Sequence, residues 1–111
     1  METMLMSRAK KVDANQAEIV KTFRSLGAKV AITSSAGDGF PDLVVQYRYP
    51  YRLDNIKHSL DTMLVEVKDG SKPPSKRRLT PEQEEFHAEF VCHIVETVQD
   101  VYDLLEINYQ D

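Results

Sequence analysis

The sequence has a single cysteine, no long apolar run and no positive charge in its last quarter, and each of these absences excludes a class of protein. The lone Cys92 excludes an internal disulfide and a zinc site built from several cysteines, and it fits a reducing compartment. The longest apolar runs have three residues, as in Leu43-Val44-Val45, so none predicts a membrane span. The first six residues lack a cationic start and a long apolar stretch, which predicts no secretory signal. We therefore expect a cytoplasmic protein.

The size and composition of the chain predict one compact domain. Its 111 residues are enough for a single hydrophobic core and too few for two. Hydrophobic residues make up 41% of the chain and charged residues 29%, proportions typical of a folded domain and not of a disordered segment. We therefore treat residues 1–111 as one domain, in which residues 1–11 form a loose basic arm.

The net charge of −4 conceals an uneven distribution along the chain. Residues 1–80 hold all 14 lysines and arginines against nine acids, a balance of +5, whereas residues 81–111 hold nine acids and no Lys or Arg, a balance of −9. Local fields, and not the sum over the chain, decide whether a polyanion binds. The basic first part therefore keeps nucleic acid among the possible partners. The acidic last helix region, residues 96–106, is expected to face away from it.

Apolar periodicity and turn residues predict an alternation of helices and short strands. Apolar residues at helical spacing predict helices over residues 13–26, from Thr80 onward and over 98–105. Apolar or alternating runs predict strands at residues 29–33, 43–47, 63–68 and 92–95. The expected loops cover residues 34–39, 48–61 and the basic stretch 72–78. This order predicts the α/β class, with a mixed sheet flanked by helices.

Three polar residues lie in or beside two of the predicted strands. Residues two apart in a strand share a face, so Glu66 and Lys68 project together while Val65 and Val67 face the other side. Burying the Glu66 carboxylate among apolar neighbours is costly unless a cation compensates for it. The candidates are Lys68, a metal ion or both. Asp42 stands at the start of a neighbouring strand and converges on Glu66 if the two strands pair.

Two carboxylates that converge in this way favour a hard divalent cation. Like charges about 4 Å apart repel by roughly 4 kcal/mol at an effective dielectric constant of 20, and a bound dication turns this repulsion into attraction. Oxygen ligands without thiolates favour Mg²⁺ or Mn²⁺ over Zn²⁺. Such an ion polarises a phosphoryl oxygen, and the Lys68 ammonium can hold a water or stabilise developing charge. The simpler alternative is that Glu66 and Lys68 form an ordinary ion pair and that Pro41-Asp42 is a turn.

Three short motifs, taken in order, resemble a known group of nucleases. Gly39-Phe40-Pro41-Asp42-Leu43 and Glu66-Val67-Lys68 resemble the signature of the PD-(D/E)xK nucleases. With Thr80-Pro81-Glu82-Gln83 they resemble the virus-type replication-repair nuclease (VRR-NUC) domain, over most of the chain. The resemblance implies a single-domain, restriction-endonuclease-like αβββαβ core and a Mg²⁺- or Mn²⁺-dependent endonuclease that hydrolyses DNA phosphodiester bonds. Small members are often phage-encoded homodimers associated with branched DNA such as Holliday junctions, which implies the cytoplasm of a bacterial host.

The resemblance also implies roles for the residues of these motifs. Asp42 and Glu66 would bind the metal ion, and the backbone carbonyl of Val67 would be a further ligand. Lys68 would position a water or stabilise charge on the phosphate. Water attacks phosphorus in this chemistry, so no covalent enzyme intermediate is needed.

Two helix residues complete the set that the resemblance implies. The family pattern places a carboxylate on the first helix, where Glu18 is the matching position and Asn15 and Gln16 are nearby polar alternatives. Glu18 would assist at the metal, or it is a solvated helix residue. Thr80 and Gln83 have the spacing of a capping box, which explains both residues without any function. The resemblance implies that Gln83 also supports the active site, and the two roles are compatible.

A basic loop follows the strand that carries Glu66 and Lys68. Four cations fall within seven residues there, namely Lys72, Lys76, Arg77 and Arg78. Lysine and arginine contacts to phosphates give salt-dependent affinity that does not depend on sequence, so we expect these residues to bind DNA. The alternative is a loop that only confers solubility. Arg48 and Arg52 flank tyrosines that can stack on unpaired bases, or that pack among themselves.

Two other classes of function remain open at this stage. The first is a non-catalytic nucleic-acid-binding module on a nuclease-like fold, which would bind DNA without cutting it. The second is a protein-interaction or inhibitor domain whose acidic last quarter engages a basic partner. A nuclease with defined sequence specificity is disfavoured, because the chain has little room for a separate reading domain.

Overall fold

The protein is an α/β domain with a four-stranded mixed sheet, as the sequence predicts. The computed structural model describes residues 12–50 and 59–107. Its elements are α1 (Gln16–Ser25), β1 (Lys29–Ile32), β2 (Leu43–Tyr49), β3 (Ser59–Val67), α2 (Pro81–Glu89), β4 (Cys92–Val95) and α3 (Val98–Leu104). Two 3₁₀ turns, η2 (Ser34–Ala36) and η3 (Pro74–Lys76), lie in the loops. The predicted order of helices and strands is confirmed.

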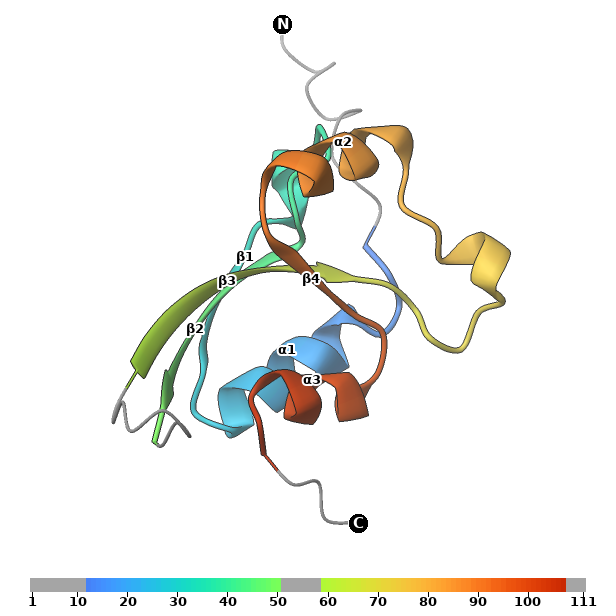
Figure 1. Cartoon of the computed structure of the whole chain (residues 1–111). Helices are drawn as coiled ribbons and strands as arrows, with labels where there is room; N and C mark the ends of the chain where they lie inside the picture. The colour runs from blue at the N-terminus through green and yellow to red at the C-terminus, as the bar shows by residue number, and fades with distance from the viewer. Residues whose placement is uncertain (1–11, 51–58, 108–111) are drawn as a thin grey trace, which may run out of the picture.

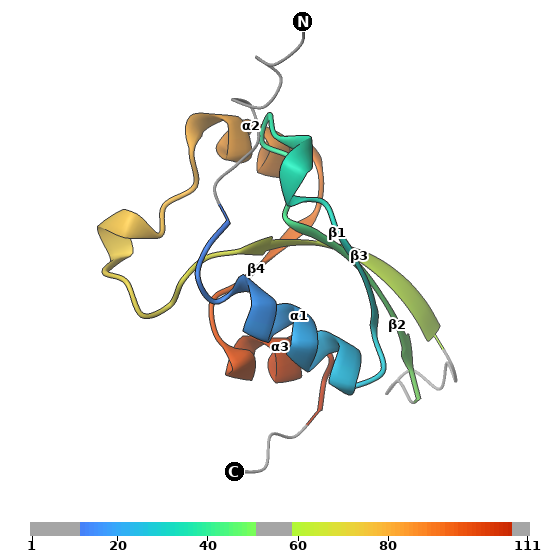
Figure 2. The same ribbon diagram turned by 180° about the vertical axis from the view of Figure 1, so that it is seen from behind.

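The sheet is antiparallel at one end and parallel at the other. The strands lie in the order β1-β2-β3-β4, and the first three pair antiparallel. β3 and β4 pair parallel, because the chain between them crosses over through α2. Figures 1 and 2 show α1 and α3 together beneath the curved sheet, with α2 apart from them above it.

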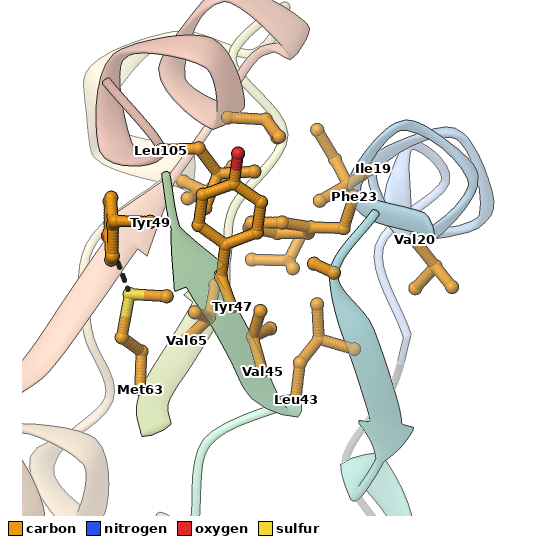
Figure 3. Packing of buried hydrophobic residues seen from close by; sticks show 14 residues of the cluster. Ile19, Val20, Phe23, Leu43, Val45, Tyr47, Tyr49, Met63, Val65 and Leu105 are labelled. Carbon is orange, nitrogen blue, oxygen red and sulfur yellow. Dashed lines mark hydrogen bonds between the residues drawn. The ribbon is translucent and has the colours of Figure 1, made fainter. Parts of the chain in front are cut away.

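The hydrophobic core lies between the sheet and the pair α1 and α3. Residues at helical spacing on α1, namely Ile19, Val20 and Phe23, face alternate residues of β2 and β3 (Figure 3). Tyr49 closes one end of this core, since its hydroxyl donates to the Leu104 carbonyl at 3.1 Å. In the described part of the chain, none of the helices has the length and hydropathy that crossing a bilayer requires.

Three predicted boundaries differ from the structure. The prediction of one loop over residues 48–61 is wrong at both ends, because β2 continues to Tyr49 and β3 already begins at Ser59. Tyr47 and Tyr49 alternate onto the core face, so the strand period continues past the predicted end. Residues 51–58 lie outside the described residues. α1 begins at Gln16 and not at residue 13. The apolar run over residues 92–95 also predicts a buried strand, which is wrong, because β4 is a sheet edge on which only Val95 is buried.

The start of α2 is fixed by a capping box. The Thr80 hydroxyl accepts the Gln83 N–H, and the Gln83 side chain accepts the Thr80 N–H, as the spacing predicts. Phe86 of this helix packs edge-on against Phe40, with ring centroids 5.3 Å apart. The loop that contains Phe40 is therefore in contact with α2.

Candidate functional site

Asp42 and Glu66 face each other across the β2–β3 pair. The register pairs Leu43 with Val65, so the next residues outward, Asp42 and Glu66, lie opposite one another. Opposed residues of an antiparallel pair share a face of the sheet, with Cβ atoms about 4.5–5.5 Å apart. Leu43 and Val65 point into the core, so the two acids occupy the other face, on the side of α2. The pairing of the two strands, on which the predicted convergence depends, is confirmed.

A buried network joins Glu66 to Gln83 and Lys68. Gln83 Nε2 donates to Glu66 Oε2 at 3.0 Å, and Lys68 Nζ donates to Gln83 Oε1 at 2.8 Å. Lys68 Nζ also lies 3.9 Å from Glu66 Oε2. The glutamine amide therefore stands between the carboxylate and the ammonium group, each bonded to the end of the amide that suits its charge.

The capping box determines which way this amide points. Gln83 Oε1 accepts two N–H groups, from the Thr80 backbone at 2.9 Å and from Lys68. Both of these partners can only donate, so the oxygen must face them and Nε2 must face the Glu66 carboxylate. Helix capping and support of the site are thus performed by one side chain at once.

Asp42 is held by the strand that carries Glu66. Its Oδ2 accepts the Val67 N–H at 2.8 Å, one residue beyond its cross-strand neighbour. The exposed fractions are 2% for Asp42, 1% for Glu66, 9% for Lys68 and 2% for Gln83. With one positive charge on Lys68 and one negative charge each on Asp42 and Glu66, the four side chains carry a formal charge of −1. They lie in a site from which water is largely excluded. Two hard oxygen donors and a net negative charge suit a divalent cation such as Mg²⁺ or Mn²⁺.

The structure does not bring Glu18 into this cluster. The Glu18 side chain is exposed on α1 and lines a separate groove that also contains Asp69 and Glu96. Asp69 is engaged in its own turn, where hydrogen bonds from the Ser71 hydroxyl and N–H lower the pKa of its carboxyl group. Within residues 12–50 and 59–107, no group of three or more His, Cys, Asp or Glu side chains is arranged to hold a metal ion.

The predicted basic loop is ordered by one of its own arginines. Arg77 donates to the Lys72 carbonyl at 2.7 Å and forms an ion pair with Glu96 at 3.1 Å. This guanidinium group therefore braces the loop against the start of α3. Lys76 and Arg78 are exposed beside it.

The remaining cations of the prediction lie elsewhere. Arg48 is on β2, six residues from Asp42, which is about 20 Å along a strand. Lys72 is exposed and lies 3.9 Å from Asp13. Arg52 and the basic arm over residues 1–11 lie outside the described residues.

Asn15 and Gln16, which the sequence offers only as polar alternatives to Glu18, make hydrogen bonds near the site. Asn15 Nδ2 donates to the backbone carbonyls of Lys68 and Glu96, both at 3.1 Å. Gln16 is buried and hydrogen-bonded to Ser34 at 2.9 Å. Gln16 could have been found from the sequence, because it is a polar residue at the helical spacing of the apolar Ile19, Val20 and Phe23.

Cys92 offers a chemical reporter of the charge on Glu66. Burial, and secondly the negative charge of Glu66, raise the pKa of this thiol. We expect Glu66→Gln to lower the thiol pKa, so that maleimide reacts with the protein faster at pH 7.5. The measurement is the rate of alkylation against pH, which is unambiguous because the chain has one cysteine.

The control for this prediction is Glu89→Gln, which removes a charge from an exposed position of α2 and should leave the thiol pKa unchanged. Equal alkylation rates for Glu66→Gln and the unaltered protein would show that the carboxylate does not act on the thiol.

Comparison with family models, with curated proteins and with solved structures finds no match to this chain.

Proposed function

We propose that the protein is a Mg²⁺- or Mn²⁺-dependent DNA endonuclease of the VRR-NUC type. The observation that carries this proposal is the buried pairing of Asp42 with Glu66, beside an ammonium group that Gln83 holds in place. The order of the elements from α1 to β4 agrees with the αβββαβ core that the resemblance implies. Glu18 is not part of this proposal, because its side chain is exposed and lines another groove.

Each residue of the cluster would have a separate role in the proposed reaction. Asp42 and Glu66 would hold the metal ion, together with the Val67 carbonyl. The ion, when bound, would polarise a phosphoryl oxygen and lower the pKa of a water. Lys68 places a positive charge where negative charge develops on the phosphate, and it is the most exposed of the four side chains. Gln83 would hold both charged groups in place, since it bonds the ammonium group and the Glu66 carboxylate, which lie 3.9 Å apart.

Surface charge favours one direction of approach for DNA. The exposed face of α2 carries the four glutamates Glu82, Glu84, Glu85 and Glu89. A phosphate backbone would be repelled there. The exposed cations Lys76 and Arg78 lie in the loop between Lys68 and α2. We therefore propose that DNA reaches Lys68 from the side of this loop. A homodimer would present two such sites to a four-way junction.

Cleavage assays on variants of the cluster test the proposal. Linear, flapped and four-way-junction DNA would be incubated with the protein and Mg²⁺, Mn²⁺ or EDTA. We expect cutting that EDTA abolishes, and that falls by about 10²–10³-fold or more in Asp42→Asn and Lys68→Met. The matched controls are Asp103→Asn and Lys21→Met, which change exposed residues outside the cluster and should cut normally.

Each other outcome contradicts a stated part of the proposal. Cutting that persists in Asp42→Asn would show that the site is wrongly assigned. Binding that weakens steeply with salt, without cutting under any metal condition, would identify a non-catalytic nucleic-acid-binding module. If DNA is neither bound nor cut, both readings fail and a protein-interaction domain is favoured.

A further inference from the structure

The start of α1 reaches the backbone of Lys68 directly, through its N-cap Asn15, and that of Asp42 indirectly, through Ser34. Asn15 uses both hydrogens of its amide, one on the carbonyl of Lys68 and one on the carbonyl of Glu96. These carbonyls follow the ends of β3 and β4. The Glu96 carbonyl also accepts the Gly70 N–H at 3.1 Å. Asn15 therefore fixes the backbone of Lys68 relative to the neighbouring strand.

Gln16, the next residue, is linked to the backbone of Asp42 through Ser34. Gln16 Nε2 donates to the Ser34 hydroxyl oxygen at 2.9 Å. The single hydrogen of the Ser34 hydroxyl has two acceptors within reach, Gln16 Oε1 at 3.2 Å and the Asp42 carbonyl at 3.5 Å. Thr33 completes this contact, because its N–H donates to the Asp42 carbonyl at 2.7 Å and its hydroxyl to the Pro41 carbonyl at 2.8 Å.

Neither side chain is explained by α1 itself. Asparagine is a preferred helix N-cap, yet Asn15 stands at the N-cap without making a capping hydrogen bond. Gln16 is 4% exposed, whereas the other buried residues of α1 are the apolar Ile19, Val20 and Phe23. Burying an amide is costly unless it is hydrogen-bonded, and a hydrophobic residue would satisfy the core without this cost. Both amides instead satisfy groups next to the site.

We propose that Asn15 and Gln16 are positioning residues, which set the placement of Lys68 relative to Asp42. This inference rests on the proposed nuclease function. Neither residue would touch the metal ion or the reacting phosphate. They act through the backbone of Lys68 and of Asp42, from the α1 side of the sheet, while Gln83 acts on the side chains from α2.

The test uses two substitutions that keep size and remove hydrogen bonds. Asn15→Asp has the same shape but loses both donors, and Gln16→Met has a similar length without the amide. The control is Ser25→Ala, which removes one local hydrogen bond to Thr22 at the exposed end of the same helix. Cleavage gives kcat and KM for DNA, and thermal unfolding shows whether each variant is folded at the assay temperature.

Two amide protons report the geometry without any need for catalysis. The Val67 N–H donates to Asp42 Oδ2, and the Lys68 N–H donates to the Val95 carbonyl at 3.0 Å. We expect Gln16→Met to shift the Val67 amide resonance and Asn15→Asp to shift that of Lys68. We expect kcat to fall by about 10- to 100-fold in each variant while KM changes little, because a small misplacement of reacting groups acts mainly on the chemical step.

Unchanged resonances, or a kcat equal to that of Ser25→Ala, would overturn the inference. A fall in kcat that is accompanied by a change in KM of similar size would also overturn it, since this would indicate a general structural role. If the unaltered protein cuts no DNA but the two resonances move as expected, the nuclease proposal fails and the positioning of Asp42 and Lys68 by α1 stands.

Discussion

Lys68→Met is expected to destabilise the fold by about 3 kcal/mol, in addition to its effect on cleavage. The substitution keeps most of the apolar stem but removes the ammonium group from a position with 9% exposure. Glu66 then loses a cation at 3.9 Å, and Gln83 Oε1 loses one of its two donors. Removing one partner of a buried charged pair costs more than the pair itself contributes, because the other charge stays in place. Urea denaturation measures the change.

A double-mutant cycle identifies the cause. Glu66→Gln removes the carboxylate charge that lies 3.9 Å from Lys68, so we expect the combination with Lys68→Met to be more stable than the sum of the single changes predicts, by about 1 kcal/mol or more. Lys76→Met is the matched control, an exposed lysine whose loss should change the free energy of unfolding by less than about 0.5 kcal/mol. Strict additivity of the two buried substitutions would contradict the network.

Gly39→Ala is expected to cost at least about 3 kcal/mol and to reduce cleavage strongly. Gly39 has a φ of +84°, and a Cβ atom added there would lie 2.4 Å from the backbone carbonyl oxygen of Glu82. Glu82 directly precedes Gln83, so α2 must move away and carry the Gln83 amide away from Glu66 and Lys68. Thermal unfolding and the cleavage rate are the two measurements.

Two other glycines separate the two causes of this effect. Gly27 has a φ of +97° with nothing within 4 Å of an added Cβ, so Gly27→Ala measures backbone strain alone, about 1–2 kcal/mol, with cleavage retained. At Gly70, where φ is not positive, an added Cβ would lie 2.8 Å from the Glu96 carbonyl oxygen, so Gly70→Ala measures the cost of a close approach alone. If Gly39→Ala resembles Gly27→Ala in both stability and cleavage, the close approach of the loop to α2 has no functional role.

Local patterns in the sequence were sufficient for most of the fold. Apolar periodicity located the helices and strands, and the spacing of Thr80 and Gln83 predicted the capping box. These signals are local, because a helix or strand repeats its apolar positions over a few residues. The convergence of Asp42 on Glu66 followed from one further assumption, that the strands on which they lie are neighbours.

The supporting contacts of the site depend on long-range proximity, which local patterns do not contain. Asn15 and Glu96 are 81 residues apart in the chain, and Asn15 and Lys68 are 53 apart. No local pattern relates them, so the family resemblance directed attention to Glu18 instead. Arg77 is a similar case, because the ion pair with Glu96 becomes visible only when β4 lies beside β3. The α/β class was therefore predictable, and the hydrogen bonds that surround Asp42 and Glu66 were not.

Because Gln83 both initiates α2 and bridges Glu66 and Lys68, the cluster is complete only when α2 is docked on the sheet. Pairing of β2 with β3 is enough to bring the two acids opposite each other. α2 has nine residues, too few to persist as an isolated helix, so its first turn forms when it docks on the sheet. A nascent chain still on the ribosome, with α2 not yet docked, therefore lacks the arrangement proposed to cut DNA. Biosynthesis itself would delay the proposed nuclease activity until α2 has docked.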